Sequence, residues 1–177
     1  MPTSIDRVTV NRAPVLTLWA AVVAEQLGFD WDEALTLGRA VAGLNAYAKG
    51  KALGIFHPKP KELAEKRKKL KHGEELQVNL LHRAVPVVRT KEGLRAVSKG
   101  NPIAPESVQR YLEGKFGEAF AATRKAMAVL ARSLPPGDLA VTAYHLYEEF
   151  RPKIPAGKKG WGVAGVLDLD RIRSMVR

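Results

Sequence analysis

An apolar run near the N-terminus limits the folds open to this chain more than any other segment. It extends from Ala13 to Ala24 and holds no charged side chain. These twelve residues are too few to cross a bilayer, which takes about 20. Apolar residues recur at three- and four-residue spacing until Gly28, so the run predicts a buried first helix. Asn11 is expected to cap that helix, with Pro14 in its first turn.

The same run could be taken for a secretion signal, because Arg7 and Arg12 precede it and Ala21–Ala24 loosely resembles a cleavage site. Asp6 interrupts the positive leader, however, and the helical pattern continues to Leu27. The chain has no cysteine, which excludes disulfides, thiolate nucleophiles and sulfur-ligated zinc. We therefore expect a cytoplasmic protein that does not interact with membranes.

The length of 177 residues suits one domain, since domains usually have about 100 to 200 residues. We predict a single compact domain over 1–177 in three parts. These are an N-terminal helical hairpin at 11–50, a basic helix plus β-hairpin at 58–100, and a C-terminal helical part at 105–177. The predicted class is mainly α, formally α+β, with about six helices in αα-hairpins and one small central antiparallel β-hairpin.

The second helix is expected to start at Asp30, where Glu33 completes a capping box, and to end near Lys49 before Gly50. Small residues recur along it every fourth position, which lets another helix approach closely. Packing within the chain is the favoured interpretation, and a homodimer seam is the alternative. The small residues are Ala34, Gly38, Ala42 and Ala46.

In the middle of the chain, Pro60 fits the first turn of a helix over 60–72. Two aliphatic runs, 76–81 and 85–89, predict strands. The turn 91–93 then predicts a hairpin, and Pro86 is expected to confine its strand to a sheet edge or to the strand's first residues. The C-terminal part should return to helix. Its first helical stretch is expected to form one or two helices, because Gly114 and Gly117 weaken the middle of that stretch. The helical stretches are 106–130 and 139–150, followed by a glycine-rich loop at 155–165 and a short helix capped by Asp168.

Residues 20–39 match the apolar pattern of a helix-turn-helix DNA reader. The second helix would, however, present Asp30, Asp32 and Glu33 at the end that approaches phosphates, where carboxylates are repelled. A simple αα-hairpin is therefore the favoured interpretation.

Positive charge gives the strongest indication of a partner. The chain has 29 Lys and Arg against 18 Asp and Glu, a net charge of +11 and a pI near 10.0. Such a surface attracts anions, with nucleic acid first and acidic proteins or lipid head groups next. Residues 57–100 hold twelve basic and five acidic residues, so the excess is largest in the middle of the chain.

Seven basic residues fall on the predicted helix at 60–72 or just before it, and that helix has only a small apolar stripe. Such a helix suits a phosphate backbone, with the following hairpin acting as a wing, although a merely solvated helix is the alternative. The C-terminal loop adds two lysines beside Trp161, which could stack on a base or instead cover the core. The predicted contacts are Lys59, Lys61, Lys66, Arg67, Lys68, Lys69, Lys71, Arg89, Lys91, Arg95, Lys158 and Lys159.

Chemical motifs are scarce. Gly160–Gly165 matches G-x-G-x-x-G, but Pro152 and Pro155 precede it and no βαβ unit is expected, so we predict no dinucleotide site. We interpret His145 and Glu149 as a helix-surface pair. No nucleophile elbow, phosphate-binding loop or metal-ligand pair is present, so we predict no metal, no cofactor and no enzymatic activity.

The predicted function is nucleic-acid binding, largely phosphate-directed and with weak sequence readout. The alternative is a protein-interaction or assembly module whose basic surface meets an acidic partner. A small-molecule enzyme without a recognisable motif ranks third.

Overall fold

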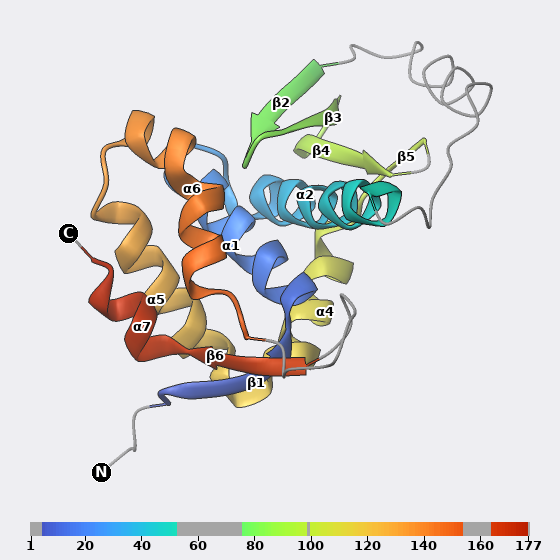
Figure 1. Cartoon of the computed structure of the whole chain (residues 1–177). Helices are drawn as coiled ribbons and strands as arrows, with labels where there is room; N and C mark the ends of the chain where they lie inside the picture. The colour runs from blue at the N-terminus through green and yellow to red at the C-terminus, as the bar shows by residue number, and fades with distance from the viewer. Residues whose placement is uncertain (1–4, 53–75, 99, 154–163, 177) are drawn as a thin grey trace.

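Helices and two small antiparallel sheets make up the computed structural model, which describes residues 5–52, 76–98, 100–153 and 164–176 (Figure 1). The predicted α+β class is confirmed. In chain order the elements are β1 (Arg7–Asn11), α1 (Arg12–Gln26), α2 (Trp31–Ala52), β2 (Leu76–Leu80), β3 (Arg83–Thr90), β4 (Gly93–Ser98), β5 (Asn101–Pro102), α4 (Pro105–Phe116), the 3₁₀ helix η2 (Gly117–Ala119), α5 (Phe120–Arg132), α6 (Pro136–Phe150), β6 (Ala164–Asp168) and α7 (Leu169–Ser174).

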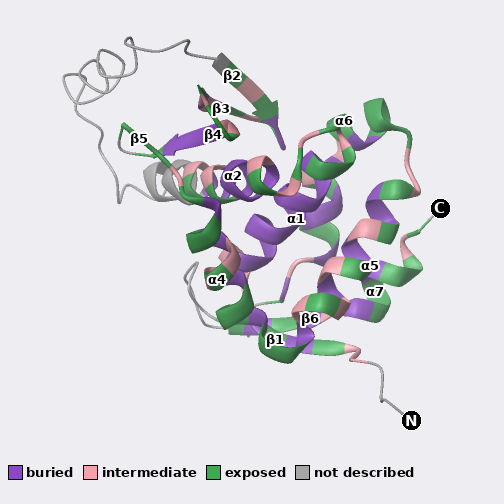
Figure 2. Cartoon of the chain, turned by 180° about the vertical axis from the view of Figure 1, so that it is seen from behind, coloured by how far each residue is buried: buried purple, intermediate pink, exposed green. Residues whose placement is uncertain are grey.

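Helix α1 lies at the centre of the fold. Every residue from Pro14 to Ala24 is buried, and α2, α4, α5 and α6 surround it (Figure 2). A helix that is apolar on all sides must be covered on all sides, which confirms the predicted buried helix. Asn11 occupies the N-cap position, as predicted, but its side chain makes no capping hydrogen bond. None of the helices in the described ranges has the length and hydropathy to span a membrane.

Helices α1 and α2 form an αα-hairpin, as predicted. The small residues Ala34, Gly38 and Ala42 are buried, and a methyl group placed on Gly38 would collide with the carbonyl oxygen of Thr17 in α1. The stripe therefore serves packing within the chain. The predicted end near Lys49 was wrong, because α2 continues to Ala52.

The N-terminus of α2 carries the predicted capping box. The N–H of Asp30 donates to Glu33 Oε1 (3.0 Å), and the N–H of Glu33 donates to Asp30 Oδ1 (2.8 Å). Glu33 has a second role, because its Oε2 accepts a hydrogen bond from the N–H of Leu94 in β4 (2.8 Å). One side chain thus fixes both the start of α2 and the position of the sheet against it.

The strands in the middle of the chain form a four-stranded sheet in the order β2-β3-β4-β5, which packs on α2 (Figure 1). The prediction of a single hairpin was therefore wrong. A two-residue turn at Leu81 and His82 joins β2 to β3. Both residues have positive φ (49° and 63°), a conformation usually taken by Gly or Asn. Leu81 is only 2% exposed, so burial of its side chain offsets the unfavourable backbone conformation.

The side of β4 that faces away from β3 is covered by other parts of the molecule along Leu94–Ala96, before β5 pairs with Val97 and Ser98. Leu94 and Ala96 lie opposite Arg89 and Val87 of β3. These are the positions of the antiparallel ladder where N–H and C=O groups point away from the partner strand. All four groups are paired, which protects the edge from joining another chain. The partners are Glu33 Oε2 (2.8 Å) and Arg95 Nη1 (2.8 Å) for Leu94, and Thr36 Oγ1 (3.0 Å) and the N–H of Ile103 (2.8 Å) for Ala96.

Pro86 matches neither predicted alternative, because β3 is not an edge strand and Pro86 is its fourth residue. Strand β3 lies between β2 and β4, and Pro86 is paired with Gln77 of β2. The ladder with β4 begins only at Val87, immediately after the proline. Pro86, which has no N–H to donate, therefore lies where β3 is not yet paired with β4. A proline in a strand needs such a position, and this need was the reason for predicting a sheet edge.

We expect Thr36→Val to lower the free energy of unfolding by about 1 to 3 kcal/mol, because the buried N–H of Ala96 loses its acceptor. The hydroxyl of Thr36 donates to Glu33 O while accepting from Ala96. Thr142→Val in α6 is the matched control, since its hydroxyl only donates to Asp138 O, and we expect a change within about 0.5 kcal/mol. Equal losses in urea unfolding of the two variants would contradict this account.

A second sheet, absent from the predictions, pairs β1 with β6 in antiparallel register from Arg7↔Asp168 to Asn11↔Ala164. The expected loop therefore ends in a strand. Gly165 is buried there, and a methyl group on it would collide with the carbonyl oxygen of Lys153. This glycine of the G-x-G-x-x-G match thus serves close chain packing. Asp168 caps α7 as predicted, because its Oδ1 accepts from the N–H of Asp170 (3.0 Å).

The C-terminal part returns to helix, as predicted. The long stretch divides at Gly117 (φ 55°) into α4 and α5. The buried residues of α6 recur at helical spacing and are Leu139, Ala143, Leu146, Tyr147 and Phe150. The indole N–H of Trp19 donates to Ala143 O in α6 (2.8 Å), which fastens α6 to the central helix. The predicted set of about six helices is not matched helix for helix. The described ranges hold five helices of at least twelve residues and, in addition, the short six-residue α7. The helix predicted at 60–72 lies outside these ranges.

Candidate functional site

Only three of the predicted nucleic-acid contacts lie within the described ranges. Arg89 and Lys91 are exposed on the β3–β4 hairpin. Arg95 is only 8% exposed, and its guanidinium donates to Leu94 O at the covered edge of β4. Its position therefore gives it a structural role that strand spacing alone did not indicate. The other nine lie outside the described ranges: Lys59, Lys61, Lys66, Arg67, Lys68, Lys69, Lys71, Lys158 and Lys159.

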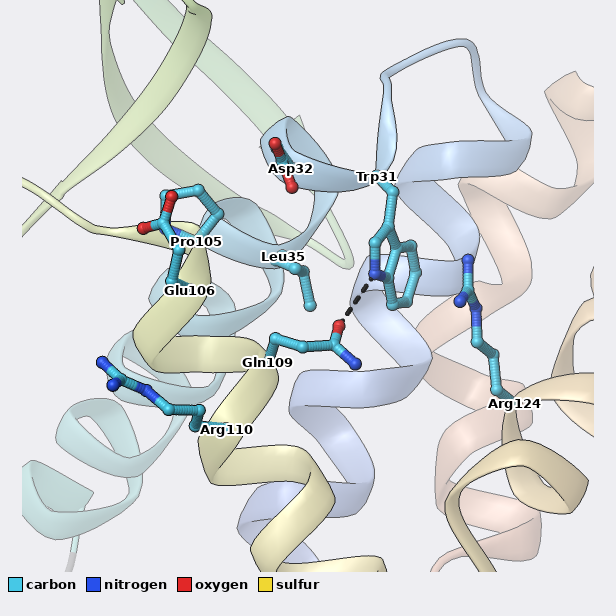
Figure 3. Close-up of a pocket in the computed structure, with 8 residues that line it drawn as sticks. All are labelled: Trp31, Asp32, Leu35, Pro105, Glu106, Gln109, Arg110 and Arg124. Atoms are coloured by element: carbon cyan, nitrogen blue, oxygen red, sulfur yellow. Dashed lines mark hydrogen bonds between the residues drawn. The ribbon is translucent and has the colours of Figure 1, made fainter.

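An open pocket of about 540 Å³ lies between α2, α4 and α5 (Figure 3). The indole N–H of Trp31 donates to Gln109 Oε1 (3.0 Å). The guanidinium of Arg124 lies 3.6 Å from the Trp31 ring centroid and also pairs with Glu25 (3.5 Å). The lining residues are Trp31, Asp32, Leu35, Pro105, Glu106, Gln109, Arg110 and Arg124.

The charge of this pocket is mixed. Asp32 and Glu106 oppose Arg110 and Arg124, and the positive charge of Arg124 is already balanced by Glu25. A phosphate group entering here would meet two carboxylates, which repel it. The pocket is therefore a poor site for a polyanion, for the same reason that the helix-turn-helix hypothesis was disfavoured.

A second group of side chains carries a different charge balance. We call it the arginine–tyrosine cluster and define it as Arg12, Arg83, Arg151, Tyr144 and Tyr147. It lies at the N-terminal end of α1, where the turn before β3 and the C-terminal half of α6 meet. Its residues come from three distant parts of the sequence, so no local motif marks it.

Asn45 of α2 joins two members of the arginine–tyrosine cluster. It is 5% exposed, and its Oδ1 accepts hydrogen bonds from Arg83 Nη2 (2.9 Å) and from the hydroxyl of Tyr144 (3.2 Å). One buried amide oxygen thus holds a guanidinium and a phenol side by side. Because Asn45 is neutral, it leaves the charge of Arg83 uncompensated.

The other half of the cluster is held by backbone carbonyl groups. Arg12 Nε donates to Pro152 O (2.9 Å), and the hydroxyl of Tyr147 makes a long contact with Arg12 O (3.4 Å). The guanidinium of Arg151 lies 5.9 Å from the Tyr147 ring centroid. Burial raises the pKa of Tyr147, so its hydroxyl stays protonated at neutral pH.

The electrostatics of the cluster favour a bound anion. Burial, and after it the positive charge of Arg151, lower the pKa of Arg12, so these two guanidinium groups repel each other. Among the described residues, no carboxylate forms a salt bridge with Arg12, Arg83 or Arg151. An anion bound beside Arg12 and Arg151 would relieve their repulsion, and guanidinium groups suit phosphate because they can donate two parallel hydrogen bonds.

A row of aromatic rings extends from the core to this cluster. Adjacent ring centroids are 5 to 7 Å apart, the range in which aromatic pairs attract each other. The row begins at buried Trp19 and ends at exposed His82. Its centroid distances are 5.2 Å for Trp19–Phe150, 6.1 Å for Phe150–Tyr147, 5.8 Å for Tyr147–Tyr144 and 6.2 Å for Tyr144–His82.

Within the described ranges, no three His, Asp or Glu side chains gather closely enough to hold a metal ion. His145 and Glu149 form the expected exposed pair on α6 (3.4 Å). Comparisons of the chain with protein-family models, with curated proteins and with solved structures found no match.

Proposed function

We propose that this protein binds nucleic acid, mainly through the phosphate backbone and with weak sequence readout. The observation that carries the proposal is the arginine–tyrosine cluster, whose three guanidinium groups have no carboxylate partner among the described residues. It belongs to a chain of net charge +11, which attracts polyanions over the whole surface. The exposed Arg89 and Lys91, with the basic residues predicted at 59–71 and at Lys158 and Lys159, would extend the contact.

Fixed arginines suit this task better than freely moving ones. Arg83 is held by Asn45, and Arg12 is held by Pro152 O, so binding orders few additional side-chain torsions. Each phosphate that they neutralise releases condensed counterions, which drives binding at low salt. None of these contacts depends on the base, so the same surface accepts many sequences.

The direct test is binding across a salt series with labelled random duplex and single-stranded DNA and RNA. If about seven phosphates of duplex DNA are contacted, the logarithm of affinity should fall against the logarithm of salt with a slope of roughly −6. Polyglutamate serves as competitor at matched charge. If polyglutamate displaces the nucleic acid at equal charge concentration, an acidic protein becomes the better partner. A flat slope, or no binding at low salt, would refute the proposal.

We expect the double variant Arg83→Gln with Arg151→Gln to bind DNA about 10-fold more weakly or worse, and to reduce the salt slope by about 2. The control is Arg132→Gln with Arg171→Gln, which removes the same charge from exposed positions on α5 and α7. The control should lose clearly less affinity, since it changes only the long-range field. Equal losses in both pairs, with unchanged melting temperatures, would remove the cluster from the proposed interface.

A further inference from the structure

The aromatic row has an exposed end that the phosphate contacts do not use. His82 is exposed and Tyr144 is half-buried, and their rings lie 6.2 Å apart at 67°. Behind them, Tyr147 and Phe150 are buried, so the row is fixed to the core. Rings fixed in this way pay little conformational entropy when they accept a further ring.

The local backbone holds His82 in this position. The turn between β2 and β3 has only two residues, and both take positive φ. Leu81 is buried and therefore anchors the turn, which directs His82 outward beside Tyr144. Histidine is one of the side chains that adopts this conformation more often than most, so the turn can keep an imidazole ring at its tip.

Arg83 follows His82 directly and is held by the same Asn45 that holds Tyr144. An aromatic surface and a cation without a carboxylate partner in the described ranges thus stand side by side. This combination suits a nucleotide, because the base can stack while the phosphate pairs with the guanidinium. In a duplex the bases are stacked on one another and are not available for such a contact.

We propose that an unpaired base stacks on the ring of His82 and meets Tyr144 with its edge, since the two rings are inclined at 67°, and that the preferred ligand is therefore single-stranded nucleic acid. The inference rests on the proposed function. Duplexes would still bind, because Arg12, Arg83 and Arg151 meet phosphates of either form, but they would gain nothing from the rings. The base contact is not sequence-specific, since every base has an aromatic face.

The test measures fluorescence anisotropy of a labelled 12-nucleotide thymidylate strand and a labelled 12-base-pair duplex at one salt concentration. His82→Asn removes the ring while keeping a residue that tolerates positive φ. Tyr144→Leu removes the second ring, and Tyr144→Phe keeps it. We expect the single strand to bind at least 10-fold more tightly than the duplex. Each ring deletion should weaken single-strand binding about 10-fold and duplex binding less than 2-fold, since base stacking contributes about 1 to 3 kcal/mol. Tyr144→Phe should bind the single strand nearly as the unchanged protein does.

Three results separate the possible failures. If neither probe binds at low salt, the proposed function itself fails. If both probes bind equally, or if His82→Asn weakens both by the same factor, nucleic-acid binding stands and the stacking inference is wrong. If Tyr144→Leu does not fold, as judged by its thermal melting, the exposed His82→Asn variant decides alone.

Discussion

Gly38→Leu should unfold the protein or bring it close to unfolding. Even the first carbon of the new side chain would collide with the carbonyl oxygen of Thr17 in α1, which is backbone and cannot rotate away. Overpacking in a core usually costs about 1 to 3 kcal/mol, and we expect Gly38→Ala in that range and Gly38→Leu above it. Since domains are stable by only about 5 to 15 kcal/mol, the larger change is severe. Urea unfolding followed by circular dichroism measures both.

Gly43, five residues along the same helix, is the matched control. It is exposed, and a methyl group there would meet no atom within 4 Å. Gly43→Ala should therefore stabilise the protein by about 0.5 to 1 kcal/mol, because alanine favours the helix over glycine. If Gly38→Ala were as harmless as Gly43→Ala, the close approach of α1 and α2 would not exist in solution.

Trp19→Ala should lower the free energy of unfolding by about 3 to 5 kcal/mol, the usual cost of deleting a fully buried aromatic residue. Trp19 has no exposed surface, meets Phe150 edge-on at 5.2 Å and donates its indole N–H to Ala143 O. Its loss opens a cavity between α1 and α6. Because the aromatic row begins at Trp19, nucleic-acid binding should also weaken.

Trp31→Ala provides the comparison for this change. Trp31 is half-buried at the rim of the open pocket, with one hydrogen bond to Gln109 and a stacked Arg124. Losing these contacts should cost about 1 to 2 kcal/mol and should leave nucleic-acid binding unchanged. Thermal melting of both variants checks that Trp19→Ala loses more stability than Trp31→Ala. If Trp31→Ala lowered the melting temperature more than Trp19→Ala, the packing of Trp19 would not be the larger contribution to stability.

Much of the helical framework could be predicted because it depends on neighbours within four residues. The apolar spacing of α1, the capping box at Asp30 and Glu33, and the Asp168 cap all follow from local geometry. Strand pairing was predicted less well. Strand β6 pairs with β1, more than 150 residues earlier, and nothing local in 164–168 marks that partner. The turn at Leu81 and His82 lacks the glycine or asparagine that usually marks a hairpin.

The candidate site shows the same division between local and distant information. Arg89 and Lys91 are exposed on the hairpin and their nucleic-acid contacts stay a prediction, whereas the guanidinium of Arg95 donates to Leu94 O on the covered side of β4. Arg12, Arg83 and Arg151 were not predicted as contacts, since none of them lies in a run of consecutive basic residues. The net positive charge of the chain was the one sequence feature that indicated further basic residues without an acidic partner.

The sequence by itself determined that the chain is rich in helices, that its first helix is buried, that Gly38 packs against a neighbouring helix and that its net charge is strongly positive. Only the tertiary structure decided which cations stand together without a carboxylate partner in the described ranges, and which aromatic rings lead to them. Helix periodicity and caps are set by hydrogen bonds and side chains a few residues apart. Asn45 holds Arg83 and Tyr144 together only because α2, the sheet and α6 pack around α1, and that packing depends on the whole core.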